Sequence, residues 1–525
     1  MSEGGSERPT DRERGPGSAP ALAPAGRRWV LVAATLGSSM VFLDNSTVNV
    51  ALPALQRSLG ASVVDVQWVI NAYTLFLASL LLIGGALGDQ LGRRRVFVAG
   101  VGLFTLASVA CGFAVSTDML IASRAAQGVG GALLTPGSLA LINGAYPRDR
   151  RGPAIGLWSG FSAIASATGP VLGGYLIDTL SWRGVFFLNV PLALAVLAVA
   201  WWRIPATPGE ASSRRLDVAG AITAVLGLGG VVYALIESSN RSFAAPSVLV
   251  ALFGGIAVLG LFLALERRAR HPMVPLELFR SRAFSGANVL TLFLYAALSG
   301  LLFFLPMNLI EVQGYSATAA GAALLPFVLS MFLLSRWSGG LVERVGARLP
   351  LVVGPLLVAV SFLLYARTGG TGPYWSAVFP AVLVQGLGMA VSVAPLTTTV
   401  MASVSDARSA TASGINNAVS RVAGLLAIGA FGALMVGLFG ARLDARLPAL
   451  ELPPAAVQTV RARRTDLAAL TAPAALDARQ SQELRQAVDA AFVHGFRIVM
   501  LAFAGLAVAA SGVAYLTLRE DVASD

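Results

Sequence analysis

The stretch GALGDQLGRRR, residues 85–95, joins two long apolar segments near 66–88 and 96–114. Each segment holds the roughly 20 apolar residues that cross a hydrocarbon layer of about 30 Å. A related stretch, GLVERVGAR, occupies residues 340–348, so that Asp89 matches Glu343 and Gly92 matches Gly346. The glycine-rich turn with its arginines therefore marks a connection between two spans, and it occurs twice.

A second pair of stretches supports an internal repeat. AQGVGGA at residues 126–132 returns as VQGLGMA at 384–390. Collinear matches indicate that a six-span unit was duplicated and that the spans within 216–265 were inserted between the copies. Parallel repeats of this kind build transporters whose halves rock about a central site. Chance similarity between glycine-rich helices is the alternative.

The composition fits this architecture. Of 525 residues, 56% are hydrophobic and 12% are charged, whereas a soluble domain carries about 25% charged residues. We predict an all-α polytopic membrane protein with two six-helix bundles related by a pseudo-twofold axis and two inserted central helices. The fourteen expected spans lie near 29–52, 66–88, 96–114, 119–144, 153–177, 184–202, 216–237, 246–265, 283–310, 318–337, 349–366, 373–395, 409–437 and 491–517.

The distribution of arginine predicts the orientation. The chain has a net charge of +11 and no lysine. Short loops after even-numbered spans carry most of the arginines, and cytoplasmic loops are enriched in this way. We therefore expect both termini in the cytoplasm. The arginines of these loops are Arg93, Arg94, Arg95, Arg148, Arg150, Arg151, Arg203, Arg214, Arg215, Arg267, Arg268, Arg270, Arg280, Arg282, Arg344, Arg348 and Arg408.

The expected domains follow from these spans. Residues 1–26 are rich in Pro, Gly, Ser and Arg and are expected to be a disordered cytoplasmic tail. Residues 29–202 form the N-terminal bundle, 216–265 the two accessory helices, and 283–517 the C-terminal bundle. Within the last, residues 438–490 mix Arg, Asp, Glu, Ala and Pro, and we expect an extracellular loop that is partly helical around 475–490.

The sequence lacks the residues that metal binding and ATP hydrolysis require. His271 and His494 lie in separate regions, and Cys111 is the single cysteine, so we expect no metal site and a packing role for Cys111. The sequence holds no Gly-Lys-Ser/Thr phosphate loop. We therefore expect neither enzymatic activity nor a cofactor, and an ion gradient as the energy source. The positive charge is explained by membrane orientation, so we expect no nucleic-acid partner.

The first span, however, contains an acid. MVFLDNSTVNVALPAL, residues 40–55, places Asp44 in an apolar segment with no Arg within a helical turn. Ionisable residues inside a membrane are costly and mark functional sites. On the fourth span, Arg124 begins RAAQGVGGA and is the candidate partner of Asp44. The alternative is that Arg124 extends outward to the membrane surface.

Taken together, these stretches resemble the major facilitator superfamily, and within it the fourteen-span drug:proton antiporter family. The resemblance covers residues 29–517, and Asp44 with the following TVNVALP (47–53) is similar to the family's first-span signature. It implies that Asp44 and Arg124 couple protons to transport. It also implies that the loop between spans two and three is a conformational latch, whose residues are Gly85, Asp89, Gly92 and Arg93. Asp89 is able to cap the next helix, while Gln90 stands where the family often has arginine.

The fifth span carries the stretch that bears on the direction of transport. GLWSGFSAIASATGPVLGG, residues 156–174, resembles the antiporter motif of exporters, with Ala165 in place of a usual glycine. Its matching residues are Gly156, Gly169, Pro170, Gly173 and Gly174. A plain helix-packing seam is the alternative. The stretches 181–192, 271–284 and 414–424 are also similar to the fourteen-span family.

The expected function is a proton-coupled antiporter that exports a bulky amphipathic drug or antibiotic across the plasma membrane. Its partners are the amphipathic small molecule, protons and membrane lipid, and we expect a monomer. A proton symporter or facilitator that imports a small metabolite is one alternative, and a ligand sensor without transport is another. The candidate cavity residues are Asn45, Asn49, Gln67, Tyr73, Gln127, Asn308, Asn416, Asn417 and Arg421. Glu311 is expected to be interfacial rather than a second proton site.

Overall fold

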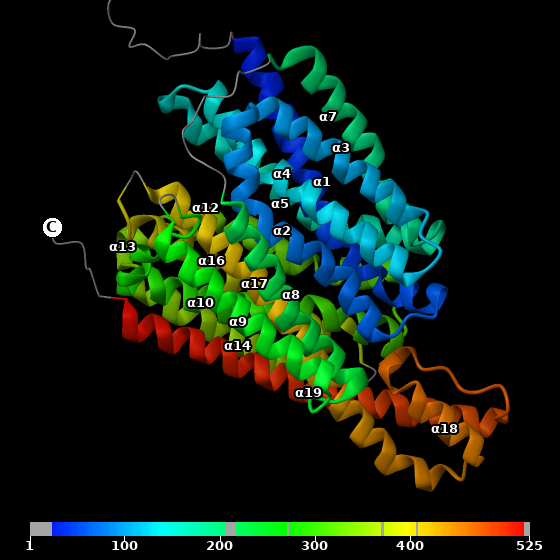
Figure 1. Ribbon diagram of the computed structural model, residues 1–525. Helices are drawn as coiled ribbons and strands as arrows, with labels where there is room; N and C mark the ends of the chain where they lie inside the picture. The colour runs from blue at the N-terminus through cyan, green and yellow to red at the C-terminus, as the bar shows by residue number, and fades with distance from the viewer. Residues whose placement is uncertain (1–23, 206–216, 270–271, 369–371, 406–407, 519–525) are drawn as a thin grey trace, which may run out of the picture.

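The computed structural model describes residues 24–205, 217–269, 272–368, 372–405 and 408–518, and these residues form helices without strands. The N-terminal half comprises α1 (Pro24–Leu59), α2 (Val63–Leu91), α3 (Arg93–Gly112), α4 (Thr117–Ala145), α5 (Arg148–Thr179), α6 (Arg183–Phe187) and α7 (Asn189–Arg203). The central pair is α8 (Val218–Arg241) and α9 (Pro246–Arg268). Figure 1 shows the N-terminal half in blue to teal beside the green-to-red remainder of the chain.

The C-terminal half begins with η2 (Leu276–Arg280) and α10 (Arg282–Met307), which continues as a π-helical turn, η3 (Asn308–Val312). It goes on with α11 (Ala317–Ala322), α12 (Leu325–Gly339), α13 (Leu341–Val345), α14 (Arg348–Tyr365), α15 (Tyr374–Ala377), α16 (Phe379–Ala402), α17 (Ser409–Arg446) and α19 (Ala478–Thr517). Between α17 and α19 lie η5 (Leu447–Leu450), α18 (Pro454–Ala462) and η6 (Arg464–Ala469). The expected loop 438–490 is therefore largely helical.

The all-α polytopic membrane fold is confirmed, whereas the number of spans is not. Thirteen helices of the described residues are long and apolar enough to cross a membrane. Helix α1 is not among them, because Asp44, Asn45 and Asn49 lower its mean hydropathy. Its 36 residues still pack inside the N-terminal half. The count of fourteen therefore stays a prediction.

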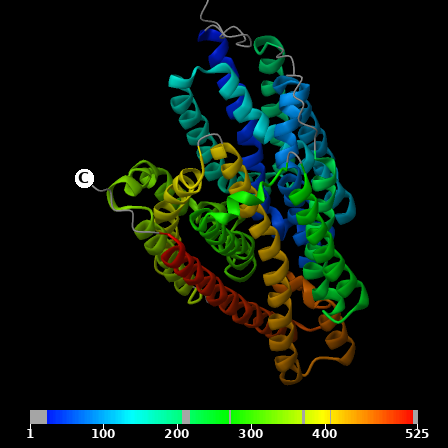
Figure 2. The ribbon, with the colours of Figure 1, turned by 60° about the vertical axis from the view of Figure 1, so that its left-hand side comes forward.

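Both ends of the described chain lie at one end of the bundle. The start of α1 and the end of α19 face the same side, and the α18 region projects from the opposite side (Figure 1, Figure 2). We call these the terminal end and the α18 end. The expected tail at 1–26 lies outside the described residues up to residue 23, and residues 24–26 already belong to α1. Arg214, Arg215 and Arg270 also lie outside them.

The central helices pack onto the seam between the halves. Val232 and Ile236 of α8 join a buried cluster with Leu75 and Ala78 of α2 and with Leu425 of α17. Helix α9 packs on α8 and is otherwise largely exposed on its surface. The inserted pair is thus accessory to the two halves, on the side where α2 and α17 meet.

Local backbone geometry agrees with the repeat. Gly92 ends α2 with a φ of 97°, and Gly346 ends α13 with a φ of 75°. Residues with side chains rarely adopt a positive φ of this size, whereas glycine adopts it without strain. Both copies of the repeated stretch therefore turn the chain at the same matched glycine.

Candidate functional site

Asp44 and Arg124 form a buried ion pair. Nη1 of Arg124 on α4 lies 2.6 Å from Oδ2 of Asp44 on α1, and the two side chains are 1% and 0% exposed. A charge taken out of water is tolerated when it is paired and hydrogen-bonded. The expectation that Arg124 faces the interior and meets Asp44 agrees with this geometry, and the outward orientation of Arg124 is wrong.

The second oxygen of Asp44 is held by two amides. Nε2 of Gln127 donates to Oδ1 at 2.9 Å, and Nδ2 of Asn189 donates to the same oxygen at 3.1 Å. Asn189 also donates to Oγ of Ser108 at 3.0 Å, and Ser108 donates to the carbonyl of Phe186 at 2.8 Å. The carboxylate thus accepts from donors on two further helices, α4 and α7, and Ser108 of α3 accepts from Asn189 beside it.

Arg124 has further partners besides Asp44. Its Nε donates to the carbonyl of Val69 at 3.2 Å, and its Nη1 also donates to Oε1 of Gln127 at 2.6 Å. The centre of the guanidinium lies 4.2 Å from the centroid of the Tyr73 ring. A cation over an aromatic face is stabilised by the ring quadrupole. The pair and its neighbours therefore form one connected network inside the N-terminal half.

Asn189 and Ser108 were not among the residues predicted from sequence. Asn189 lies in SWRGVFFLNVPL, which carried only the family resemblance. A signal was present, because Asn189 is a strongly polar residue at the start of an apolar span. Gln127 was predicted as a cavity residue, and the structure places it in the ion-pair network instead. Cys111 is buried, and its thiol lies 3.8 Å from Oε1 of Gln127.

The glycine motif of α5 packs directly on the segment that follows Asp44. A Cβ at Gly169 would overlap Oγ of Ser46, and a Cβ at Gly173 would overlap the Thr47 side chain. Oγ1 of Thr47 also donates to the carbonyl of Gly169 at 3.2 Å. Small residues let two helix backbones approach closely. The motif therefore holds α5 against α1 within one turn of the buried acid.

The same helix contacts the other half at the α18 end. A Cβ at Gly174 would overlap the carbonyl of Ala317, and a Cβ at Gly321 would overlap the carbonyl of Pro170. Oδ2 of Asp178 accepts from the Thr318 amide at 2.8 Å and from the Thr318 hydroxyl at 2.6 Å. Its Oδ1 accepts from the Ala317 amide at 3.1 Å. Asp178 of α5 thus satisfies free amides at the start of α11 in the opposite half.

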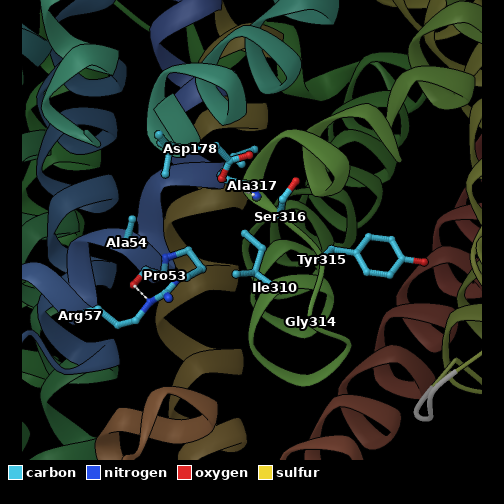
Figure 3. Close-up of a pocket in the computed structure, with 11 residues that line it drawn as sticks. Pro53, Ala54, Arg57, Asp178, Ile310, Gly314, Tyr315, Ser316 and Ala317 are labelled. Carbon is cyan, nitrogen blue, oxygen red and sulfur yellow. Dashed lines mark hydrogen bonds between the residues drawn. The ribbon is translucent and has the colours of Figure 1, made fainter. Parts of the chain in front are cut away.

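A second charged contact lies beside it. Nε of Arg57 on α1 lies 3.4 Å from Oε1 of Glu311 in the π-helical turn. A pocket of about 310 Å³ lies between these contacts and is lined by Pro53, Arg57, Asp178, Ser316 and Ala317 among others (Figure 3). We call the Asp178 and Arg57 contacts together the α18-end contact. Glu311 therefore pairs across the two halves.

Near the other end of α5, two glycines have open space beside them. Gly156 precedes Gly174 by 18 residues, which is five helical turns at about 3.6 residues per turn, so both face the same direction. A Cβ at Gly156 or at Gly160 would meet no atom of the described residues within 4 Å. On this face α5 is thus in tight contact with the opposite half at the α18 end and without such close packing at these two positions towards the terminal end.

The predicted latch residues lie at the turn between α2 and α3. Asp89 pairs with Arg93 at 3.3 Å, and Nη1 of Arg93 donates to the carbonyl of Ala140 on α4 at 3.4 Å. Gly85 of α2 approaches Pro136, which also lies on α4. The expectation that Asp89 caps the next helix is wrong, because Gly92 is the N-cap residue of α3 and the Asp89 carboxylate accepts from the Arg93 side chain instead.

The remaining cavity candidates do not form one cluster. Nδ2 of Asn416 donates to Asn288 and Thr291 of α10, at 3.2 and 2.7 Å, and Asn308 accepts from Gln313 at 2.6 Å. Asn45 is exposed, and its carbonyl accepts from Asn49 at 3.1 Å. The others, Gln67, Asn417 and Arg421, lie at or near the seam between α2 and α17. No metal-binding cluster occurs in the described part of the chain.

Comparisons with known proteins agree with this architecture. The model of the Major Facilitator Superfamily matches residues 34–428. The chain is 34% identical over 420 residues to multidrug resistance protein Stp of Mycobacterium tuberculosis, covering 79% of this chain and 77% of that protein. It is 31% identical over 519 residues to the tetracenomycin C resistance and export protein of Streptomyces glaucescens, covering 97% and 95%.

Solved structures show the same fold at lower identity. A bacterial homologue of the human lysosomal transporter Spinster, in an inward-facing and unoccupied conformation, superposes with a TM-score of 0.66 at 19% identity, covering 94% of this chain and 98% of that one. The nucleoside transporter NupG follows the same fold with a TM-score of 0.59 at 12% identity, covering 94% and 100%.

Proposed function

The chain belongs to the major facilitator superfamily, and we propose that it exports a bulky amphipathic compound, such as an antibiotic, across the plasma membrane in exchange for protons. Its relatives support this proposal, since they are named as resistance and export proteins, and one is a probable actinorhodin transporter of Streptomyces coelicolor. The chain would act without a cofactor and without chemical conversion of its cargo.

The observation that carries the proposal is the buried Asp44 in its network of donors. A carboxylate in this position gains or loses a full charge when it exchanges a proton, and the strength of its contacts with Arg124 changes accordingly. Protonated Asp44 would become a neutral acid and would hold Arg124 less strongly. Asp44 is therefore the proton carrier, and Arg124 is the residue that responds to its charge.

Helix α5 offers a mechanical connection between this site and the other half. Its glycines contact Ser46 and Thr47 on α1, a few residues beyond Asp44, and its last turns contact α11 through Gly174 and Asp178. A shift of α1 caused by the proton would reach the α18-end contact through α5. Binding of the proton would then favour one of the two arrangements of the halves.

The orientation follows from the arginine-rich loops, which we assign to the cytoplasm. The terminal end then faces the cytoplasm and the α18 end faces outward. With the halves in contact at the α18 end and apart along α5 at the terminal end, the compound would enter from the cytoplasm. The Asp89–Arg93 turn is the proposed latch on that cytoplasmic side.

Import by symport and ligand sensing without transport are the competing functions. Everted membrane vesicles, whose cytoplasmic face is outside, distinguish them when tetracenomycin C and actinorhodin are offered as probes. We expect an acidic lumen to drive accumulation of at least one probe, and nigericin, which collapses the pH gradient, to abolish it. Proton-driven loss from the lumen would establish import. Saturable binding without any proton-driven movement would establish a sensor.

A further inference from the structure

Arg421 on α17 is an arginine inside a membrane span, and no acidic residue of the described chain pairs with it. It lies ten residues beyond Thr411, where the span begins, which is about 15 Å at 1.5 Å per residue. Its side chain is largely buried, and its Nε has no hydrogen-bond partner within the described residues. Arg124, the buried arginine of the other half, has three hydrogen-bond acceptors and an aromatic ring.

The helical position of Arg421 fixes the direction in which it points. Gly414 and Gly432 of α17 both face α2, where they approach Leu82 and Gln67. At about 100° per residue, Arg421 is seven residues and roughly 20° away from the Gly414 direction. Further around the same side of α17, Gly424 faces α10, because it approaches Ser299. Arg421 therefore points between α2 and α10, into the region where the two halves face each other.

Further polar groups lie near the same side of α17. Asn417 precedes Arg421 by one turn and is exposed, and its amide donates only to the Ser413 carbonyl of its own helix. On α2, Tyr73 is buried, and its hydroxyl has no hydrogen-bond partner within the described residues.

A cation in the membrane interior that lacks a counter-charge is costly, and such residues mark the pathways of substrates and ions. A guanidinium offers five N–H donors in a fork that fits a carboxylate. We propose that Arg421 binds an anionic group of the transported compound, a carboxylate or a phenolate. This inference rests on the proposed function, and it predicts that the exported compounds are aromatic or amphipathic acids.

The test is an equilibrium binding measurement with three probes that share one ring system. They are 1-pyrenebutyrate, its neutral methyl ester, and the corresponding pyrenyl trimethylammonium cation. The full-length protein is held in phosphatidylcholine nanodiscs, without a proton gradient, and binding is followed by pyrene fluorescence. We expect the carboxylate to bind at least tenfold more tightly than the ester and the cation. Arg421→Gln should remove this preference, and Arg421→Lys should keep part of it.

Arg408→Gln is the matched control, because Arg408 at the start of α17 is exposed and pairs with Glu277 outside the span. It should leave the preference unchanged. Absence of carboxylate binding, equal affinity for the three probes, or a preference that survives Arg421→Gln would overturn the proposal. So would full displacement of pyrenebutyrate by added phosphatidylglycerol, which would identify a lipid headgroup as the anion. Since no gradient is used, these outcomes are independent of whether proton-driven export occurs.

Discussion

Oδ2 of Asp44 accepts a 2.6 Å hydrogen bond from Nη1 of Arg124, and this ion pair joins α1 to α4 inside the N-terminal half. The pair is almost fully buried, so each charge depends on the other for its stability. The contact also lies within one turn of the segment on which the α5 glycines pack. Contacts thus run from the proposed proton site to α5, and from α5 to the end of the bundle where the two halves touch.

Removing the arginine should destabilise the protein. Arg124→Ala leaves Asp44 as an unpaired buried charge, and breaking a buried pair in this way costs about 3–5 kcal/mol. We expect a lower midpoint of thermal unfolding in detergent. The double variant Asp44→Asn, Arg124→Gln should recover a large part of the loss, because no isolated charge remains. A double variant no more stable than Arg124→Ala would contradict this account.

Removing an amide from Asp44 should weaken the network around the buried pair. Asn189→Ala deletes one donor to Oδ1, and a hydrogen bond to a charged group contributes about 1.5–3 kcal/mol. We therefore expect a lower midpoint of thermal unfolding in detergent. Asn45→Ala, next to Asp44 but exposed, should leave the midpoint in place, and equal midpoints in the two variants would contradict this contribution of Asn189.

Adding a methyl group to the α5 motif should open the α18 end. Gly174→Ala introduces a Cβ that overlaps the Ala317 carbonyl, and overpacking costs about 1–3 kcal/mol. The conformation with this end in contact should lose population about five- to 150-fold. Gly156→Ala is the control on the same helix face, where nothing lies within 4 Å. Distances between spin labels on the two halves report the shift, and equal distances in both variants would refute it.

The cross-half bonds of Asp178 should help to keep the same end closed. Asp178→Ala removes the acceptor of two α11 amides, and loss of a comparable helix cap costs about 0.5–2 kcal/mol. Ala54 lines the nearby pocket, so Ala54→Cys should react faster with a water-soluble maleimide in the Asp178→Ala background. Cys111 is fully buried and should contribute little background. Asp118→Ala, an exposed acid on α4, should leave the rate unchanged, and an unchanged rate in Asp178→Ala would exclude the role.

The sequence allowed the Asp44–Arg124 contact to be predicted because both residues are charges in apolar spans, and such charges need partners. Asn189 and Ser108 could not be found in the same way. Small polar residues are common in membrane helices as interhelical hydrogen bonds, and nothing in the local pattern of α3 or α7 distinguishes those that meet an acid. Their role depends on how three helices pack around α1.

The same limit applies to the α18-end contact. The glycines of α5 were predicted as a motif, but their partner α11 belongs to the other half, and no periodicity in one helix identifies its neighbour across the halves. Asp178 lies at the end of an apolar span, where acidic residues are common and do not indicate a special contact. In contrast, the repeated glycines Gly92 and Gly346 were matched from sequence, since a turn of this type depends on local backbone geometry alone.

The central claim is that Asp44 carries the proton, and Asp44→Asn in everted vesicles tests it most directly. Asparagine keeps nearly the same shape and stands in for the neutral acid, but it cannot release a proton. We predict that accumulation of tetracenomycin C or actinorhodin driven by an acidic lumen falls to the level seen with nigericin, whereas exchange of the compound without a gradient continues. Proton-driven accumulation at the wild-type rate in Asp44→Asn would contradict the account.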